Sequence, residues 1–404
     1  MESKPDSGAA VRPALDVIVP VFRGEASTRA CIESVLRSGG ALAFELVVID
    51  DCSPEPALSD WLRQQAADGR FRLLRNETNL GFVASVNRGM AEHPDRDVVL
   101  LNSDTEVPSG WLDRLNACAA RDPRIATVTP FSNEATICSY PFEGWDGGLP
   151  GGLGLAELDR LFATVNAGRT VDLPTGIGFC LWIRRSALNS LGAFDEQAFG
   201  RGYGEESDFC MRAAAAGWRN VLAGDVFVYH AGSASFGSAE RLERVRNAET
   251  VMAERHPSYA ERVFEFIAAD PLEPLRAAVD EARAARSIDA ARAVLREQQR
   301  KAKQLLDRLA AARRLEALLN RCRADFAASQ QALQAAEGFV REREREIEQL
   351  AQQQDQMVRE HAERAARVTG LEVQLRDTKA HLDAILNSRS WRYTRALLRL
   401  IGRS

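Results

Sequence analysis

The fold of this 404-residue chain is decided by one stretch, Val98-Val99-Leu100-Leu101-Asn102-Ser103-Asp104. Four apolar residues end abruptly in a short polar turn, a pattern that predicts a buried strand with Asp104 just beyond its carboxyl end. Ligands bind at this end of the strands in open α/β sheets. A carboxylate in that position can hold a divalent cation against a diphosphate. The stretch therefore predicts a nucleotide-linked substrate.

The composition narrows the class of protein. The chain is 45% hydrophobic and 27% charged, which is typical of a globular protein, and its length predicts two structural units. A formal net charge of -5 provides no basic surface for nucleic acid. The seven cysteines never occur as C-x-x-C, so neither a disulfide frame nor a zinc site is predicted. No apolar run resembles a signal peptide or a membrane span, and we therefore expect a cytoplasmic protein.

Strand-like and helical segments alternate from Asp16 to about Thr129, as in a parallel sheet covered by helices on both faces. The expected strands are Asp16–Val21, Glu45–Asp50, Phe71–Arg75, Asp97–Leu101 and Ile125–Thr129. The expected helices lie near Ser27–Arg37, Ala57–Ala67, Val83–Glu92 and Gly110–Ala120. This half of the chain is expected to bind a nucleotide.

The sequence becomes irregular and rich in glycine between Phe131 and Pro174. Either a lid over a binding site or a surface loop without function fits this composition. Regular structure is expected again in an apolar run at Gly178–Ile183, helices near Ser186–Leu191 and Glu206–Gly217, and a strand at Val221–Val228.

The C-terminal third is predicted to be a long helix, because no proline follows Pro274 and Ala, Leu, Glu, Gln and Arg dominate. Apolar residues recur in heptad phase from Leu305 to Ile385, which predicts a left-handed coiled coil and a homo-oligomer. An antiparallel fold-back within one chain is the alternative. The last segment, 388–404, combines five arginines with aromatic and aliphatic residues and has no acid. It is expected to form a basic amphipathic helix on an anionic membrane surface or on another protein.

Two later segments supply groups for chemistry. Gly204-Glu205-Glu206-Ser207-Asp208 is a carboxylate cluster, and Val226-Phe227-Val228-Tyr229-His230 ends an apolar strand on an imidazole. They offer an acid, a base and a metal ligand. The structural alternatives are an acidic first turn of a helix, favoured by its dipole, and an interior histidine.

Two segments of the first half suit a nucleotide. Asp50 and Asp51 end a strand, where one carboxylate can accept the imide N–H of a pyrimidine, although such an Asp is often only a helix cap. Asn79, Gly81 and Asn87 stand at the entry to a helix, a place that suits a nucleotide or phosphate, with capping again as the alternative. No G-x-G-x-x-G follows the first strand, which weighs against a dinucleotide-dependent oxidoreductase.

The order of these motifs resembles glycosyltransferase family 2, the inverting enzymes of GT-A fold. The resemblance covers roughly Leu15 to Phe236 and rests on Val19-Pro20-Val21-Phe22, Ile49-Asp50-Asp51-Cys52-Ser53, Asn79-x-Gly81-x5-Asn87-x-Gly89, Asn102-Ser103-Asp104, Thr175-Gly176, Gly204-Glu205-Glu206-x-Asp208-Phe209-Cys210-x-Arg212 and Tyr229-His230. It implies an α/β domain with a Rossmann-like mixed sheet. We accordingly divide the chain into a disordered segment 1–14, a GT-A domain 15–270, a helical coiled-coil stalk 271–387 and the tail 388–404.

The resemblance also implies roles for single residues. Asp51 matches the residue that reads the base, and Asp104 matches the acidic position that meets the metal. Glu206 matches the general base, a role that Glu205 could share, and His230 matches a position that helps to hold the metal. The remaining nucleotide-sugar-binding positions are Pro20, Val21, Asp50, Asn79, Gly81, Asn87, Asn102, Ser103, Thr175, Gly176 and Arg212, the last as a partner of phosphate or of Glu206. Asn102 stands where the metal-binding motif usually begins with an Asp.

These implications add up to a metal-dependent inverting glycosyltransferase that uses Mg²⁺ or Mn²⁺ and a nucleotide-diphosphate sugar. The expected acceptor is a hydroxyl of a lipid-linked glycan, as in O-antigen or capsule synthesis at the inner membrane face. The alternative is a weakly active or inactive transferase-like scaffold whose coiled coil organises partners. A nucleotidyltransferase is disfavoured, because the chain lacks a glycine-rich phosphate loop that carries lysine.

Overall fold

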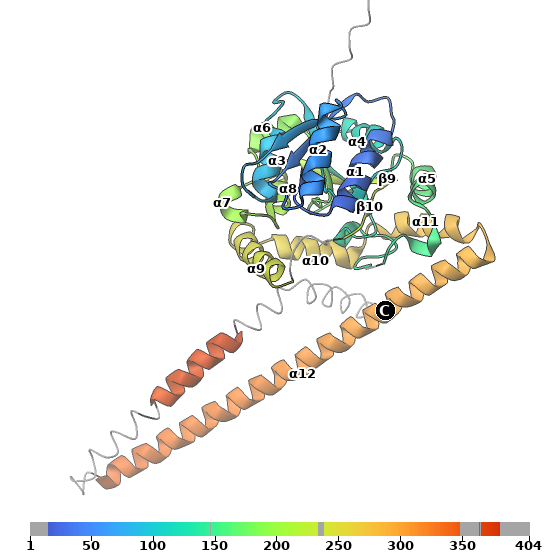
Figure 1. Cartoon of the computed structure of the whole chain (residues 1–404). Helices are drawn as coiled ribbons and strands as arrows, with labels where there is room; N and C mark the ends of the chain where they lie inside the picture. Colours follow the sequence, from blue (N-terminus) through green and yellow to red (C-terminus); the bar gives the residue numbers. More distant parts are fainter. Residues whose placement is uncertain (1–14, 146, 233–237, 348–362, 364, 380–404) are drawn as a thin grey trace, which may run out of the picture. The chain divides into compact units, whose positions relative to one another are not determined.

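The computed structural model describes residues 15–145, 147–232, 238–347, 363 and 365–379 (Figure 1). The chain divides into two compact units, Met1–Lys301 and Ala302–Ser404. The predicted disordered segment 1–14 and the predicted amphipathic tail 388–404 lie outside the described residues. None of the described helices combines the length and the apolar character needed to span a membrane.

The first unit is built on a mixed sheet of eight strands with the order β3-β2-β1-β4-β8-β6-β9-β7. Its strands β7 and β8 run antiparallel to their neighbours, and the other pairs are parallel. The expectation of an α/β domain with a mixed sheet, followed by a helical region, is confirmed. The strands are β1 Leu15–Val21, β2 Phe44–Asp50, β3 Arg72–Arg75, β4 Asp97–Leu101, β6 Ile125–Phe131, β7 Thr170–Asp172, β8 Cys180–Ile183 and β9 Arg219–Phe227.

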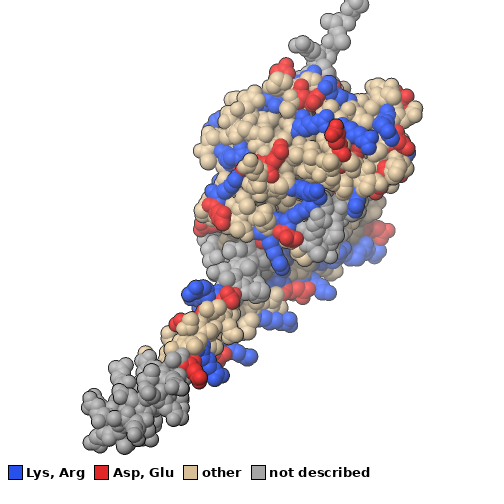
Figure 2. Space-filling model, turned by 60° about the vertical axis from the view of Figure 1, so that its left-hand side comes forward, with Lys and Arg blue, Asp and Glu red and all other residues tan. Residues whose placement is uncertain are grey.

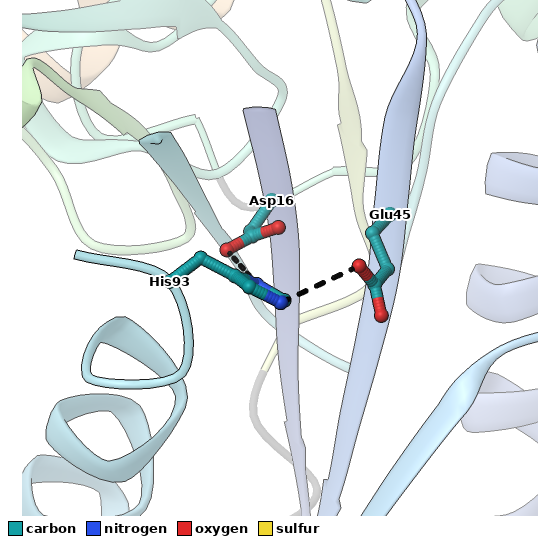
Figure 3. A group of neighbouring side chains, drawn as sticks. All are labelled: Asp16, Glu45 and His93. Atoms are coloured by element: carbon teal, nitrogen blue, oxygen red, sulfur yellow. Dashed lines mark hydrogen bonds and ion pairs between the residues drawn. The ribbon is translucent and has the colours of Figure 1, made fainter. Parts of the chain in front are cut away.

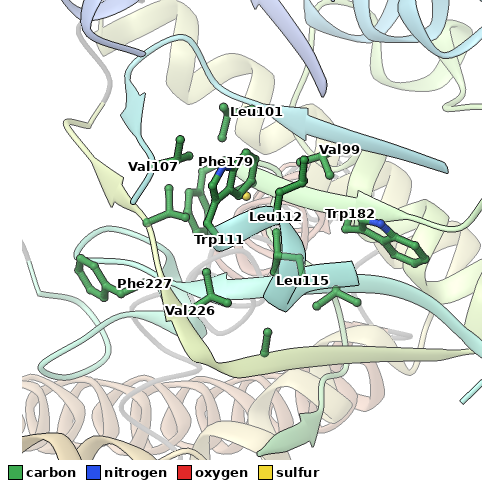
Figure 4. Close-up of a cluster of buried hydrophobic side chains, with 14 of the residues drawn as sticks. Val99, Leu101, Val107, Trp111, Leu112, Leu115, Phe179, Trp182, Val226 and Phe227 are labelled. Carbon is green, nitrogen blue, oxygen red and sulfur yellow. The ribbon is translucent and has the colours of Figure 1, made fainter. Parts of the chain in front are cut away.

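Alternating side chains send each strand's apolar residues into two cores, one on each face of the sheet. In β1, Val17 and Val19 enter the first core and Ile18 enters the second. The first core is covered by α1 Glu25–Arg37, α2 Pro56–Ala67, α4 Trp111–Ala120 and α5 Leu155–Val165. The second is covered by α3 Phe82–Met90, α6 Arg185–Leu191 and α8 Glu205–Ala215. Figure 4 shows how Trp111 and Leu115 of α4 pack against side chains of β4, β8 and β9.

The glycine-rich region after β6 is largely built into the first core. It contains the short helices η1 Thr136–Cys138 and η2 Pro150–Gly152 as well as α5 and β7. Ile137, Tyr140 and Phe142 are buried. Both expectations for this stretch, a lid and a surface loop without function, are therefore wrong for residues 135–142. The glycines lie in turns, but the aromatic and aliphatic residues between them are part of the hydrophobic core.

In the described part of the chain, the sheet is followed by the helices α9 Ser238–Arg255, α10 Tyr259–Ala269, α11 Glu273–Ala284 and α12 Ile288–Ile347. Leu275 and Val279 of α11 enter the first core, and the compact first unit continues to Lys301. The boundary at residue 270/271 is thus a correction: α11 belongs to the sheet-bearing unit and not to the stalk. The sequence analysis missed this because the composition of α11 is that of the long helix after it.

The second unit contains most of α12, a helix of 60 residues, and a helical stretch at 365–379. At roughly 1.5 Å per residue, α12 alone is about 90 Å long. Leu318, Phe326 and Leu333 are exposed on it. The coiled coil and the homo-oligomer remain predictions.

Candidate active site

The carboxyl ends of β1, β2 and β4 meet at one edge of the sheet. The backbone N–H of Asp51 donates to the carbonyl of Val21 at 2.8 Å, and that of Asn102 donates to the carbonyl of Phe179 at 2.9 Å. Parallel pairing aligns the β1 and β2 ends, with Val21 opposite Asp50. Val21 is buried and Pro20 is half-buried, so these two residues frame the edge rather than project from it.

Asp104 and His230 lie beside each other at this edge. A two-stranded ribbon of β5 (Thr105–Glu106) and β10 (Tyr229–His230) pairs His230 with Thr105. The ribbon is closed by Ala231, whose N–H donates to the carbonyl of Asp104 at 2.9 Å. His230 Nε2 lies 3.3 Å from Asp104 Oδ1. The predicted pair of metal ligands is thus brought together from positions far apart in the sequence.

The imidazole of His230 is held in one orientation. Its Nδ1 lies 2.7 Å from the carbonyl oxygen of Glu134, which can only accept, so Nδ1 carries the hydrogen. The side chain of Asn133 clamps the backbone of His230 by donating to its carbonyl at 2.7 Å and accepting from its N–H at 2.8 Å. Phe179 stacks on the ring with centroids 5.5 Å apart. These contacts leave Nε2 facing Asp104.

Two opposing effects act on the pKa of His230. Burial is the largest single effect and lowers the pKa, but the hydrogen bond to Asp104, the charge of Asp104 and the contacts with Glu134 together raise it more, so the net shift is upward from 6.5. The carbonyl of Glu134 acts in the same direction as Asp104. The carboxylate therefore favours a cation at Nε2, which is a proton when no metal is bound.

Glu206 and Glu205, both predicted as candidate bases, differ in access. Glu206 is half-buried, and its carboxyl group lies against Gly178, where a Cβ would come 3.6 Å from Cδ. Glu205 is only 4% exposed, and burial, followed by the charge of Glu206, raises its pKa well above 4.5. Glu206 is therefore the more exposed of the two residues.

Thr175 and Gly176 form a buried turn behind Glu206. Thr175 Oγ1 donates to Ser207 Oγ at 3.2 Å, which ties the turn to α8. The N–H of Gly176 points to Cys210 Sγ at 3.1 Å. A Cβ on Gly176 would lie 2.6 Å from Cδ1 of Leu181, so a larger residue there would have to displace that side chain. Both residues position the segment that carries Gly178 and Phe179.

The two aspartates at the end of β2 are both engaged by the protein. Asp50 accepts from the N–H of Ser53 at 2.8 Å and from Ser59 Oγ at 3.0 Å. Asp51 accepts at 2.8 Å from the side chain of Asn76 and from the N–H groups of Leu80 and Gly81. A carboxylate has about four acceptor positions, so one direction on Asp51 remains for a base N–H.

The loop 79–81 is shaped by these contacts. Asn79 is half-buried, and its carbonyl lies 3.5 Å from Arg201 Nη2. Gly81 has φ +90, and a Cβ there would lie 2.6 Å from Cα of Arg201. Next to Asp104, Asn102 and Ser103 are half-buried, and Thr105 Oγ1 donates to the Asn102 carbonyl at 2.7 Å.

Asn87 and Arg212, predicted to bind the nucleotide sugar, have structural partners. The amide of Asn87 donates to the carbonyl of Phe194 at 2.8 Å and accepts from its N–H at 3.1 Å. Arg212 pairs with Asp208 at 2.8 Å and donates to the carbonyls of Leu191 and Ala193. The polar atoms of both side chains thus hold neighbouring segments together, and their assignment to nucleotide-sugar binding stays a prediction.

The donor set of Asp104 and His230 suits a divalent cation: one carboxylate oxygen and one imidazole nitrogen whose other nitrogen donates to a carbonyl. A second cluster of the same residue types lies at the amino ends of β1 and β2 (Figure 3). There Asp16 and Glu45 flank His93, with Asp16 Oδ2 2.9 Å from His93 Nδ1. Arg96 Nη1 also lies 2.9 Å from Asp16 and 2.7 Å from Glu45. The guanidinium already offsets part of the negative charge of the two carboxylates, and we interpret this cluster as an ion-pair network.

Sequence reasoning missed Asn133, Glu134 and Phe179. The signal for the first two was present, since they follow β6 as polar residues at the carboxyl edge. Basic and acidic side chains are interspersed on the face of the molecule shown in Figure 2.

Comparison with known proteins gives the following matches. Residues 16–192 match the model of "Glycosyl transferase family 2". An uncharacterized protein of Sinorhizobium fredii is 29% identical over 57% of this chain, a match that spans 26% of its own length. The N-acetylglucosaminyl-diphospho-decaprenol L-rhamnosyltransferase of Mycobacterium tuberculosis is 28% identical over 48% of this chain and 72% of its own. The crystal structure of GalNAc-T7 with UDP, GalNAc and Mn²⁺ shares 17% identity, with a TM-score of 0.46 over 66% of this chain and 55% of that one.

Proposed function

We propose that the protein is a metal-dependent inverting glycosyltransferase, because residues 16–192 match the model of "Glycosyl transferase family 2". It would move a sugar from a nucleotide-diphosphate donor to a hydroxyl group of a lipid-linked glycan. The proposal names Glu206 as general base, Asp104 and His230 as metal ligands, and the Asp51 region as the site of the base.

One observation supports this proposal: the side chains of Glu206 and His230 lie against the short segment Gly178-Phe179, and His230 faces Asp104. Glu206 lies against Gly178, and His230 stacks on Phe179 while facing Asp104 at 3.3 Å. The three come from positions 104, 206 and 230 and from separate elements. If each of these residues had only a structural role, the three would not need to lie at the same edge of the sheet.

The chemistry follows from these positions. Glu206 takes the proton from the acceptor hydroxyl as its oxygen bonds to the anomeric carbon, and the bond to the diphosphate oxygen breaks on the opposite face. One displacement of this kind inverts the anomeric configuration. A positioned carboxylate base contributes about 10²–10⁴-fold to such a proton transfer.

Asp104 and His230 would hold a divalent cation, Mg²⁺ or Mn²⁺. When bound, the cation offsets the negative charge that develops on the leaving diphosphate. Asn102 contributes an amide where an acidic residue is usual, so Asp104 supplies the only carboxylate of this motif. His230 compensates by adding a neutral nitrogen ligand, oriented by Glu134.

The acceptor is proposed from the mycobacterial relative, whose name describes transfer of L-rhamnose to a sugar on decaprenyl diphosphate. A lipid-linked acceptor would place the enzyme at a membrane surface. Donor and acceptor are therefore best tested together, with a panel that includes L-rhamnose, hexose and N-acetylhexosamine nucleotides.

The test is release of nucleoside diphosphate from this panel with Mg²⁺ or Mn²⁺, with and without a polyprenyl-diphosphate-linked sugar. We expect release that requires both metal and acceptor, and a glycosylated lipid as product. Release of pyrophosphate would indicate a nucleotidyltransferase. No release with any donor would favour the alternative of an inactive scaffold.

We also propose that α12 pairs with a second copy of the chain. Leu319, Phe326 and Leu333 repeat every seven residues, and Phe326 and Leu333 are 42% and 39% exposed. A partner helix would cover this seam. The mass of the full chain in solution should fall to that of a monomer in the double variant Phe326→Glu/Leu333→Glu. Leu318→Glu, at an exposed position outside the seam, should leave the mass unchanged.

A further inference from the structure

The helices at the end of the first unit contact the loop that holds His230. This loop, residues 132–140, joins β6 to the glycine-rich region. Its two arms are tied together, since Tyr140 N–H donates to the Ser132 carbonyl at 2.8 Å and Ala135 N–H donates to Ser139 Oγ at 2.9 Å. The loop therefore behaves as one closed piece between its two sets of outside contacts.

One set of outside contacts comes from α11. Arg276 is 4% exposed, and its guanidinium donates to the carbonyls of Ser139 and Ile137, both at 2.9 Å. Nη1 donates to Asp270 at 2.5 Å, which balances the charge. A planar guanidinium that binds two carbonyls fixes both the distance and the orientation of the peptide groups.

A second group of buried polar side chains supports the same end of the loop. Tyr140 Oη donates to Asp280 Oδ1 at 2.6 Å and accepts from Arg283 Nη1 at 2.7 Å. Arg283 in turn makes two bonds to Glu297 at 2.7 and 2.8 Å. All of these residues belong to the first unit. The first turns of α12 are thus fixed to the loop through Tyr140.

The other set of outside contacts is the clamp on His230. Asn133 bonds to the His230 backbone twice, and the Glu134 carbonyl accepts from Nδ1. Displacement of the carbonyls of Ile137 and Ser139 would therefore move Asn133 and Glu134. Contacts that orient a metal-binding histidine are worth about 10–100-fold in metal affinity.

We infer that Arg276 is a positioning residue for the metal site: through the loop 132–140, it sets the direction in which His230 Nε2 faces Asp104. This inference rests on the proposed function, because it assigns a role relative to the metal that Asp104 and His230 would hold. It also makes α11, which lies outside the sheet, a part of the site.

The experiment measures Mn²⁺ binding to the purified full chain by the loss of the free-ion EPR signal, without nucleotide, together with the thermal unfolding curve. We expect Arg276→Gln to weaken Mn²⁺ binding about tenfold. Arg276→Lys keeps the positive charge beside Asp270 but cannot bind two carbonyls with one planar group. We therefore expect an intermediate loss of affinity, with Mn²⁺ binding about threefold weaker. Asn133→Ala, which acts on the same loop closer to His230, should weaken binding about as much as Arg276→Gln.

Arg185 provides the matched control. It is also a buried arginine, 9% exposed, that donates to two backbone carbonyls, those of Arg96 and Met90. It lies at the amino end of the strands, away from His230. Arg185→Gln should cost comparable stability and leave Mn²⁺ binding within about twofold of wild type.

The outcomes separate this inference from the proposed function. If His230→Gln leaves Mn²⁺ binding unchanged, the proposed metal site is wrong. If His230→Gln abolishes binding but Arg276→Gln binds as wild type does, the inference is wrong and the metal site stands. Equal weakening in Arg185→Gln and Arg276→Gln would overturn the inference in favour of general destabilisation. If Arg276→Gln fails to fold, Arg276→Lys decides, and unchanged binding in it would count against the inference.

Discussion

The two edges of the sheet carry clusters of the same residue types with opposite outcomes. At the amino edge, Asp16, Glu45 and His93 surround Arg96, which donates to both carboxylates. At the carboxyl edge, Asp104 faces His230, and among the described residues it forms no ion pair with lysine or arginine. A fixed internal cation completes the first cluster. The second leaves a carboxylate and an oriented nitrogen whose charge balance depends on a proton or a ligand.

This difference teaches that residue type alone does not identify a metal site. Two acids and a histidine within reach of one another are a candidate, but a guanidinium among them already provides part of the positive charge that a metal would bring and occupies oxygens that would bind it. The orientation of the imidazole separates the clusters further. His230 Nδ1 donates to a backbone carbonyl, whereas His93 Nδ1 faces a carboxylate.

The largest effect is expected from loss of the proposed general base at the carboxyl edge, Glu206. Glu206→Gln should lower kcat about 10²–10⁴-fold, because the amide cannot accept the hydroxyl proton. Binding of donor and metal should persist, as judged by thermal shift. Glu205→Gln is the control: it replaces a buried carboxyl group of raised pKa by a neutral amide, and kcat should stay within about threefold. Equal losses in both variants would mean that the base is not assigned correctly.

The next effect tests the charge at the same edge. Asp104→Asn removes the carboxylate but keeps its size, and transfer should fall about 10²–10³-fold because charge on the leaving diphosphate is no longer offset. The stabilisation of the protein by Mn²⁺ in a thermal-shift assay should disappear as well. Retention of metal-dependent stabilisation would show that the cation binds elsewhere, with the Asp16 cluster as the first place to look.

At the amino edge, removal of a carboxylate should affect stability and not chemistry. Asp16 is fully buried, and Asp16→Asn leaves Arg96 with a weaker partner, so the free energy of unfolding should fall by about 3 kcal/mol. Denaturant unfolding measures this. The turnover of the folded fraction should match that of wild type at low temperature. Loss of metal-dependent transfer in this variant would reverse the assignments of the two edges.

Strand ends are the most predictable part of the site. The rule that ligands meet the carboxyl ends of strands is enough to assign Asp51 and Asp104 to one edge from the sequence. Helical residues are harder to place, because a motif does not say which face of a helix a side chain occupies. Arg212 lies one turn after Asp208 and pairs with it, and Asn87 faces the segment at Phe194.

The support around His230 could not be predicted for a different reason. Asn133 and Glu134 reach it only because the loop after β6 folds back on itself, and Arg276 reaches that loop across more than 130 residues of chain. Such contacts depend on tertiary packing, which the local periodicity of the sequence does not indicate. For the same reason α11 was expected to belong to the stalk. Leu275 and Val279 have helical spacing whether they face a partner helix or a sheet.

The smallest effect concerns pH, where the two edges should again differ because an arginine keeps its charge and a histidine does not. The pKa of His230 is raised in the folded state, since Asp104 and Glu134 together outweigh burial. Without metal, its stabilising contribution is therefore complete below 6.5 and is lost as the pH rises through the folded-state pKa. The difference in unfolding free energy between wild type and His230→Gln should shrink as the pH rises above 6.5 and through the raised pKa of the folded state. A constant difference would contradict the ion pair with Asp104. Saturating Mn²⁺ should reverse the trend, because only the neutral imidazole binds a metal.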